Sequence, residues 1–230
     1  SSLLRALSKV EGIEWIRLHY AYPSNFPLDV LDEMCENEKI CNYIDIPLQH
    51  ISDKLLKMMR RGTNKKSTYL LIDEFRKRVP GIAIRTTLLV GHPGETEQDF
   101  QELCEFVQKA KLDRVGVFTY SHEENTHAFQ YKDDISDDVK QERAQHIMDL
   151  QQEISLELNN AKLGKKEKVL FDRLEGDYFI GRTQFDSPDV DNEVLLPRSG
   201  NYVRIGDFAD VKIIKAHDFD LVGALIDTKK

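Results

Sequence analysis

The chain has 230 residues, of which 40% are hydrophobic and 31% are charged. This length allows one large domain or a medium domain with a small one, and the apolar fraction can fill a core, which excludes general disorder. No run approaches the roughly 18 apolar residues of a membrane span, and these residues show no secretion leader. With 32 basic and 40 acidic residues the net charge is −8. This charge argues against a protein that binds nucleic acid with its whole surface.

The chain has three cysteines, Cys35, Cys41 and Cys104. They are too few for a disulfide scaffold, which predicts a reducing, cytoplasmic location. Their spacing also differs from that of iron–sulfur ligands, so we expect core residues and no metal site.

The first two thirds of the chain alternate strands and helices. Strands are predicted over residues 13–21, 41–48, 82–90 and 114–120, and helices over 27–39, 52–60, 67–79 and 96–110. We expect Asn25, Ser52 and Thr96 to cap three of the helices, and Gly62 to end the second. Strands that alternate with helices of this length form parallel βαβ units. Four such strands give an open sheet or part of a barrel, and the α/β pattern opens as if earlier units were missing.

A long helix is predicted from Ser136 to a stop at Gly164, and the character of the sequence changes after it. Short strands with alternating polarity follow over 167–173, 177–185, 192–196, 208–215 and 219–225. Five such strands predict a small antiparallel barrel of the oligonucleotide-binding type. We therefore expect a partial (β/α) barrel with its long helix over 1–164 and a small β-barrel over 165–230.

Ligands of α/β folds lie at the C-terminal ends of the parallel strands. Those ends are rich in polar, aromatic or glycine residues: Tyr20, Gln49, His50, Val90, Gly91, His92, Tyr120, Ser121 and His122. The loop from Gly91 to Thr96 follows a strand and opens a helix, an arrangement that suits a nucleoside-containing ligand. A tight connection without a ligand is the favoured alternative for this loop taken alone.

Gln49 and Arg61 flank one strand-to-helix turn, and they could bind ribose hydroxyls and a carboxylate, respectively. A solvated charge at the helix end is the leading alternative for Arg61. Arg85 interrupts an apolar strand and shares a face with Thr87. A buried arginine needs an anionic partner, and a ligand and an internal ion pair with Asp45 are equally good explanations.

The histidines follow no zinc-binding spacing, so each is expected to be structural. Residues 167–230 contain nine basic and thirteen acidic residues, a net charge of −4, which favours a basic protein as partner. An RNA-binding module is the alternative, with the aromatic side chains of residues 179, 185, 202 and 208 as stacking platforms. Strand alternation favours a place for these aromatics in the barrel core.

Five strings occur in one order: IRLHYAYPSNFP, IPLQHISDKLLKMMRRG, IRTTLLVGHPGETEQDF, DRVGVFTYSHEE and YFIGRTQFDSPDVDNEVL. Over nearly the whole chain they resemble the RimO family of radical S-adenosylmethionine methylthiotransferases, which modify an aspartate of a small-subunit ribosomal protein. The pairing of VGVFTYSHEE with DSPDVDNEVL favours this branch over the sister enzymes that modify tRNA adenosines, which remain the alternative. Asn125 departs from the family pattern, where a glycine is expected.

The resemblance implies a partial radical-SAM barrel followed by a TRAM domain, which binds the substrate. It implies that Gln49 and Arg61 contact the ribose and the carboxylate of S-adenosylmethionine, and that Thr87, Val90 and Gly91 lie along the nucleoside. Tyr20, Tyr120 and Ser121 would face the substrate; no catalytic residue is assigned.

The family also carries two 4Fe–4S clusters, whose cysteine ligands, including a C-x-x-x-C-x-x-C loop, are absent from these 230 residues. The resemblance therefore implies a fragment that is inactive alone. In the complete enzyme a 5′-deoxyadenosyl radical would take hydrogen from the β-carbon of the aspartate, and a methylated sulfur would then join that carbon.

Overall fold

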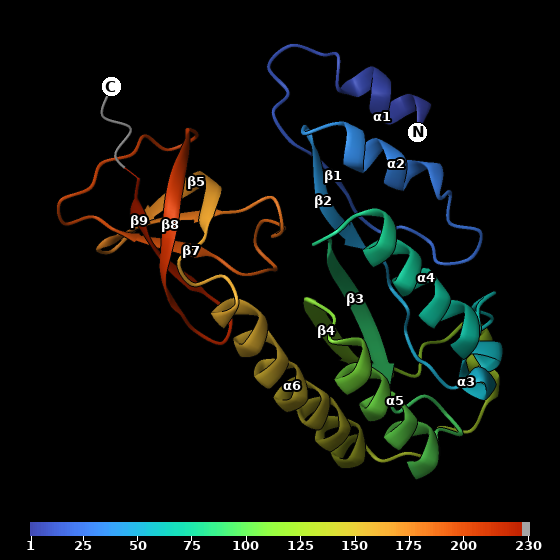
Figure 1. Ribbon diagram of the computed structural model, residues 1–230. Coiled ribbons are helices and arrows are strands. Elements are labelled where there is room, and N and C mark those ends of the chain that lie inside the picture. The colour runs from blue at the N-terminus through green and yellow to red at the C-terminus, as the bar shows by residue number, and fades with distance from the viewer. Residues whose placement is uncertain (227–230) are drawn as a thin grey trace. The chain divides into compact units, whose positions relative to one another are not determined.

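The computed structural model describes residues 1–226 (Figure 1). The chain divides into two compact units, Ser1–Gln151 and Gln152–Lys230, called here the first and the second unit. The division falls inside the long helix α6, Asp137–Asn160. The domain boundary expected at residue 164 lies beyond the end of this helix and stays a prediction. No helix among the described residues is long and apolar enough to cross a membrane.

The first unit contains a parallel sheet of four strands in the order β1-β2-β3-β4. Their bounds are Ile16–Leu18, Ile40–Asp45, Ala83–Val90 and Arg114–Thr119. The predicted parallel βαβ arrangement is confirmed. The strand expected over 13–21 has only three residues, because β1 pairs with β2 alone and the register between them shifts.

Helices α2 (Asp29–Glu36), α4 (Lys65–Arg78) and α5 (Glu97–Ala110) lie along one side of this sheet (Figure 1). The burial of β3 alternates along the strand: Ile84, Thr86, Leu88 and Val90 are buried, and the residues between them are half-buried. This alternation is typical of a strand with one face covered by helices. The short helix α3 (Asp53–Met58) follows β2, and η1 (His127–Gln130) lies between β4 and α6. Helix α1 (Ser2–Leu7) lies where no element was predicted.

The helix starts show which capping predictions were right. Thr96 caps α5 as expected, and its capping box is complete because Asp99 reaches back to the Thr96 backbone. The prediction that Asn25 caps a helix is wrong, because α2 begins after Leu28 and Asn25 has a left-handed backbone with φ 57°. Ser52 precedes α3 but makes no side-chain capping bond. The left-handed residue after α3 is Arg60, so the chain leaves the helix before the predicted stop at Gly62.

The second unit contains a closed five-stranded barrel in the order β5-β6-β7-β9-β8. The strands span Lys166–Glu175, Tyr178–Arg182, Val194–Pro197, Phe208–Ala216 and Leu221–Leu225. β5 pairs with both β6 and β8, which closes the barrel and leaves no free edge. All five strands were predicted, with ends that differ by a few residues. The expected antiparallel pairing is confirmed for four strand pairs and is wrong for the fifth, because β7 and β9 run parallel.

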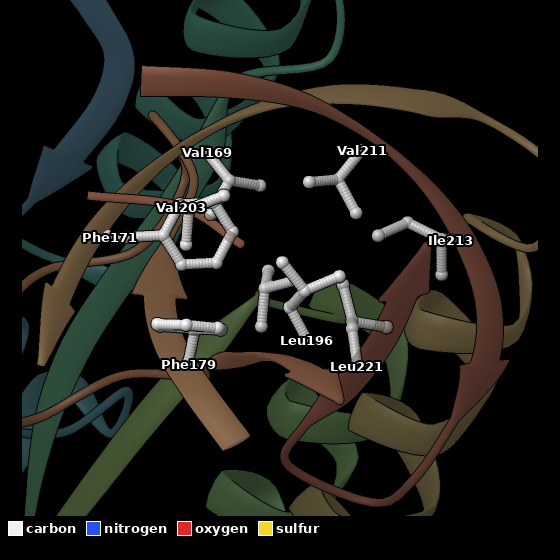
Figure 2. Close-up of a cluster of buried hydrophobic side chains, with 9 residues drawn as sticks. Val169, Phe171, Phe179, Leu196, Val203, Val211, Ile213 and Leu221 are labelled. Atoms are coloured by element: carbon white, nitrogen blue, oxygen red, sulfur yellow. The ribbon is translucent and has the colours of Figure 1, made fainter. Parts of the chain in front are cut away.

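The barrel is filled by the inward-facing side chains of its strands (Figure 2). Phe171 and Phe179 meet edge to face, with 6.5 Å between ring centroids, and aliphatic side chains surround them. Phe179 is thus a core residue, as strand alternation favoured. Tyr202, another of the four aromatics considered as stacking platforms, is 80% exposed.

We predict that Phe171→Ala lowers the free energy of unfolding of the barrel by about 3–5 kcal/mol, because it opens a cavity in a closed core. Phe171 is fully buried, whereas Leu174 on the same strand is 47% exposed. Leu174→Ala is therefore the matched control, with an expected loss of less than about 1 kcal/mol. Hydrogen exchange of the barrel amides in denaturant measures both, and equal losses would contradict the assigned core.

Candidate functional site

A hollow of about 330 Å³ lies in the first unit, where the ends of β3 and β4 and the turn after β2 come together. We call it the strand-end hollow. It is lined by Gln49, Met58, Met59, Arg60, Arg61, Leu89, His92, Tyr120, Ser121, Glu123, Thr126, His127 and Ala128. Its volume is in the range of small-ligand sites. Four residues singled out from the sequence, Gln49, Arg61, Tyr120 and Ser121, meet here.

Both backbone polar groups of Gln49 form hydrogen bonds with β3. Its backbone N–H donates to the Thr87 carbonyl at 2.9 Å, and its own carbonyl accepts from the Leu89 N–H at 2.7 Å. Its φ of 70° places it in the left-handed region, which is uncommon for a residue other than glycine. The two hydrogen bonds accompany this uncommon conformation, and residues in such conformations cluster at ligand sites.

Arg61 folds back over the end of β2 instead of extending into solvent. Its Nη2 donates to the Pro47 carbonyl at 2.7 Å, and its guanidinium lies 4.9 Å from the centre of the Tyr22 ring. Its Nε is buried and has no hydrogen-bond partner among residues 1–226. The solvated helix-end charge, which was the leading alternative, is therefore wrong. The orphaned donor fits an anionic group in the strand-end hollow.

The other residues predicted to contact the ligand do not line the hollow, so those contacts stay predictions. Val90 is buried, and its carbonyl accepts from the Tyr120 N–H at 2.8 Å. Thr87 offers its carbonyl to Gln49, as described above. Tyr20 is 81% exposed. The Gly91 N–H donates to Glu95 Oε2 at 2.9 Å. This contact within the loop from Gly91 to Thr96 agrees with the alternative interpretation of the loop as a tight connection between β3 and α5.

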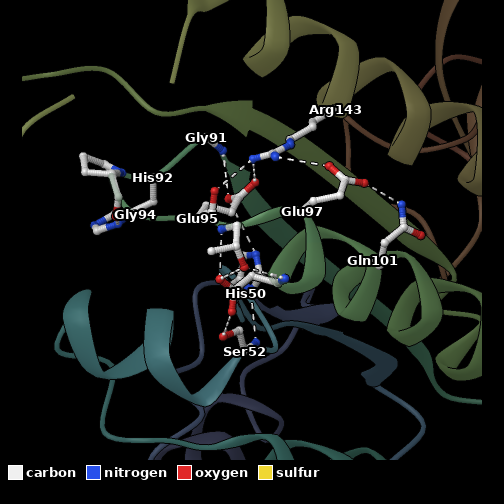
Figure 3. A network of polar contacts seen from close by, with 12 residues as sticks. His50, Ser52, Gly91, His92, Gly94, Glu95, Glu97, Gln101 and Arg143 are labelled. Atoms are coloured by element: carbon white, nitrogen blue, oxygen red, sulfur yellow. Dashed lines mark hydrogen bonds and ion pairs between the residues drawn. The ribbon is translucent and has the colours of Figure 1, made fainter. Parts of the chain in front are cut away.

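The Gly91 contact belongs to a buried polar network at the same end of the sheet (Figure 3). Arg143 of α6 donates to the Glu95 carboxylate at 2.7 Å. His50 Nε2 lies 3.7 Å from the same carboxylate, and His50 Nδ1 accepts from the Ser52 N–H at 3.0 Å. Burial raises the pKa of Glu95, although Arg143 opposes the shift. The network fastens α6 and the turn after β2 to the loop that follows β3.

The sequence interpretation missed Glu95 and Arg143. A signal for Arg143 was present, because it lies midway between Val139 and Ile147 on the apolar stripe of the long helix. A charge on such a stripe needs a buried partner. Glu95 could not be identified from the sequence as that partner, because the contact joins residues 48 positions apart.

Arg85 forms the internal ion pair considered from the sequence, with Nη1 3.4 Å from Asp45 Oδ1. Asp45 is buried, and it also accepts from the Tyr20 N–H at 3.4 Å and lies 3.8 Å from His19 Nδ1. The Asp45 carboxylate thus offsets the charge of Arg85 on the neighbouring strand β3.

No group of three or more histidine, cysteine or acidic side chains among residues 1–226 could hold a metal ion. Cys41 and Cys104 are buried, as expected of core residues, and burial raises the pKa of the Cys104 thiol to about 11. The prediction that Cys35 is a core residue is wrong, because Cys35 is exposed and its Sγ donates to the Arg78 carbonyl.

A second hollow, of about 310 Å³, lies in the second unit beside the loop over residues 183–193. Its two arginines are in ion pairs with acidic residues of the barrel: Arg173 with Glu193 at 2.6 Å and Arg182 with Asp172 at 3.0 Å. These pairs offset the positive charge that would attract a phosphate backbone.

Two family patterns match this chain, one in each part. The Radical SAM superfamily pattern matches residues 2–107, and the TRAM domain pattern matches residues 163–226. A relative from Flavobacterium johnsoniae, named ribosomal protein uS12 methylthiotransferase RimO, is 61% identical over 97% of this chain. A protein of the same name from Bacteroides thetaiotaomicron is 56% identical over 97% of the chain. The chain spans about half the length of these relatives, 51% and 52%.

Among solved structures, coproporphyrinogen III oxidase HemN from Escherichia coli, a radical SAM enzyme, superposes with a TM-score of 0.53 at 20% identity. The match covers 66% of this chain and 36% of HemN. It supports the α/β fold and carries nothing about function. The predicted combination of a partial radical-SAM barrel and a TRAM barrel is confirmed.

We predict that the first unit loses stability as the pH falls from about 7 to 4. Burial lowers the pKa of His50 from 6.5 to about 4. Between these values the unfolded chain binds a proton that the folded chain does not, so acid favours unfolding, by on the order of 2–3 kcal/mol. Burial alone would raise the pKa of Asp99, but hydrogen bonds from Lys54, Ser52 and Thr96 outweigh it and lower this pKa, which acts in the same direction at lower pH.

Fluorescence of Trp15, the single tryptophan, measures unfolding of the first unit. His50→Gln should flatten the pH dependence between pH 6.5 and 4, whereas replacement of the exposed His217 in the second unit should leave it unchanged. An unaltered pH profile in His50→Gln would contradict the assignment.

Proposed function

We propose that this chain belongs to the RimO family of methylthiotransferases, and that it serves to add a methylthio group to the β-carbon of an aspartate in the small-subunit ribosomal protein uS12. The similarity over almost the whole chain carries this proposal, since the curated relatives bear the name of that activity. Nothing in the relatives' names favours a tRNA substrate. Modification of a ribosomal protein agrees with the cytoplasmic location expected from the sequence.

We propose that the strand-end hollow binds S-adenosylmethionine. The residues present fit this cofactor, because the hollow has the size of a small-ligand site and is lined by Arg61, whose Nε is a buried donor without a partner among the described residues. Arg61 would hold the carboxylate and Gln49 the ribose, and Thr87, Val90 and Gly91 would lie along the nucleoside. When bound, the cofactor would supply the radical chemistry of the superfamily, together with the family's iron–sulfur clusters.

Tyr120 and Ser121 of the hollow, and Tyr20 at the end of β1, would face the protein substrate. We propose that residues 1–164 carry the cofactor site and that the TRAM domain, residues 165–230, binds the substrate. The second unit supports this division because its net charge is negative and both arginines of its hollow are paired. An anionic surface attracts a cationic ribosomal protein and disfavours RNA.

We predict that Arg61→Gln weakens binding of S-adenosylmethionine by about 1.5–3 kcal/mol, roughly 10- to 150-fold, because a charged hydrogen bond is lost. Arg204→Gln is the matched control, since Arg204 lies in the second unit with its side chain 77% exposed. Titration calorimetry of the chain measures both variants. Equal affinities in the unchanged chain and Arg61→Gln would remove Arg61 from the site.

We also predict that the chain binds uS12 with an affinity that falls as salt rises, and that a tRNA competitor does not displace it. Asp189→Lys, in the exposed part of the loop over residues 183–193, should weaken this binding about 3- to 10-fold through a slower association. Asp138→Lys makes the same charge change at an exposed position of the first unit. Equal effects of the two variants would contradict a docking role for the TRAM domain, and tight tRNA binding would favour the nucleic-acid alternative.

A further inference from the structure

His92 follows β3 and forms part of the wall of the strand-end hollow. Its side chain is almost fully buried, with 2% of the residue exposed. Its Nδ1 lies 3.0 Å from the carbonyl oxygen of Pro93. A carbonyl oxygen only accepts hydrogen bonds, so this contact places the proton of the neutral ring on Nδ1 and leaves a lone pair on Nε2.

That Nε2 is buried and has no hydrogen-bond partner among the described residues. The two nearest rings, Tyr120 at 5.3 Å and Tyr131 at 6.0 Å between centroids, do not supply one. The Tyr120 hydroxyl lies 3.0 Å from His122 Nδ1, and the Tyr131 hydroxyl lies 3.2 Å from His127 Nε2. Burial also lowers the pKa of His92, which favours the neutral ring and hence the acceptor.

Two residues that line the strand-end hollow each have a buried polar atom without a hydrogen-bond partner among the described residues, one a donor and the other an acceptor. Arg61 Nε, after α3, is a donor without an acceptor, and His92 Nε2, after β3, is an acceptor without a donor. A buried polar group without a partner is destabilising, so a ligand that matches both atoms gains affinity. Such a ligand has an anionic group for Arg61 and an N–H or O–H group for His92.

We propose that Nε2 of His92 accepts a hydrogen bond from an N–H or O–H group on the nucleoside end of S-adenosylmethionine, while Arg61 meets the carboxylate end. This inference rests on the proposed function of the same site. It makes His92 a specificity-determining residue for the nucleoside. The histidine expected from the sequence to be structural is satisfied at Nδ1, whereas its Nε2 has no hydrogen-bond partner among the described residues.

Two ligands and two variants test the proposal by calorimetry. S-adenosylmethionine has both ends, whereas 5′-methylthioadenosine keeps the nucleoside and lacks the carboxylate. His92→Phe removes the acceptor and keeps a ring against Tyr120, so it should weaken both ligands roughly 10-fold. Arg61→Gln should weaken S-adenosylmethionine alone. His217→Phe, at an exposed position of the second unit, is the matched control and should change neither.

Nitrogen NMR of the imidazole rings in the unchanged chain provides a second test that needs no variant. The His92 Nε2 resonance should move upfield on addition of 5′-methylthioadenosine, because the nitrogen then accepts a hydrogen bond, while the His217 resonances stay in place. A resonance that does not move would overturn the proposal, since water or nothing would then occupy the acceptor.

The outcomes separate this inference from the proposed function. If His92→Phe binds both ligands normally while Arg61→Gln loses S-adenosylmethionine, the role of His92 is wrong and the cofactor site stands. If His92→Phe weakens S-adenosylmethionine alone, His92 contacts the amino-acid end and the nucleoside assignment is wrong. If the unchanged chain binds neither ligand, both the cofactor site and the role of His92 fall.

Discussion

The pair of backbone hydrogen bonds that fixes Gln49 against β3 is the constraint on which the candidate site depends. β2 ends at Asp45, yet the chain remains attached to β3 through the contacts of Gln49 with Thr87 and Leu89. This attachment accompanies a left-handed backbone at a residue larger than glycine. The turn after β2 is consequently held beside the ends of β3 and β4, where Arg61 and Tyr120 meet around one hollow.

The buried network around Glu95 makes this arrangement rigid. Its carboxylate joins Gly91 in the loop after β3 to Arg143 in α6, and His50 lies beside it. A buried ion pair adds little net stability over an apolar core, but loss of one partner leaves an uncompensated charge and is costly. The network therefore serves to fix the position of the loop, and with it the position of His92.

The strand and helix order of both units followed from hydrophobic periodicity, and so did the closed barrel. The failures were local. Asn25 is a good capping residue, but the chain turns there before α2 begins, and tertiary contacts shortened β1. The sequence also led to Gln49, Arg61, Tyr120 and Ser121, because strand ends are where α/β sites form. It did not predict the unmatched nitrogen of His92, since satisfaction of a buried atom depends on neighbours distant in the chain.

A chemical-shift map of the chain titrated with S-adenosylmethionine tests the central claim most directly. If the strand-end hollow is the cofactor site, the largest shifts will occur at the backbone amides of Gln49, Arg61, His92, Tyr120 and Ser121, and the barrel core around Phe171 will not respond. Shifts confined to the second unit, or their absence at saturating ligand, would contradict the account.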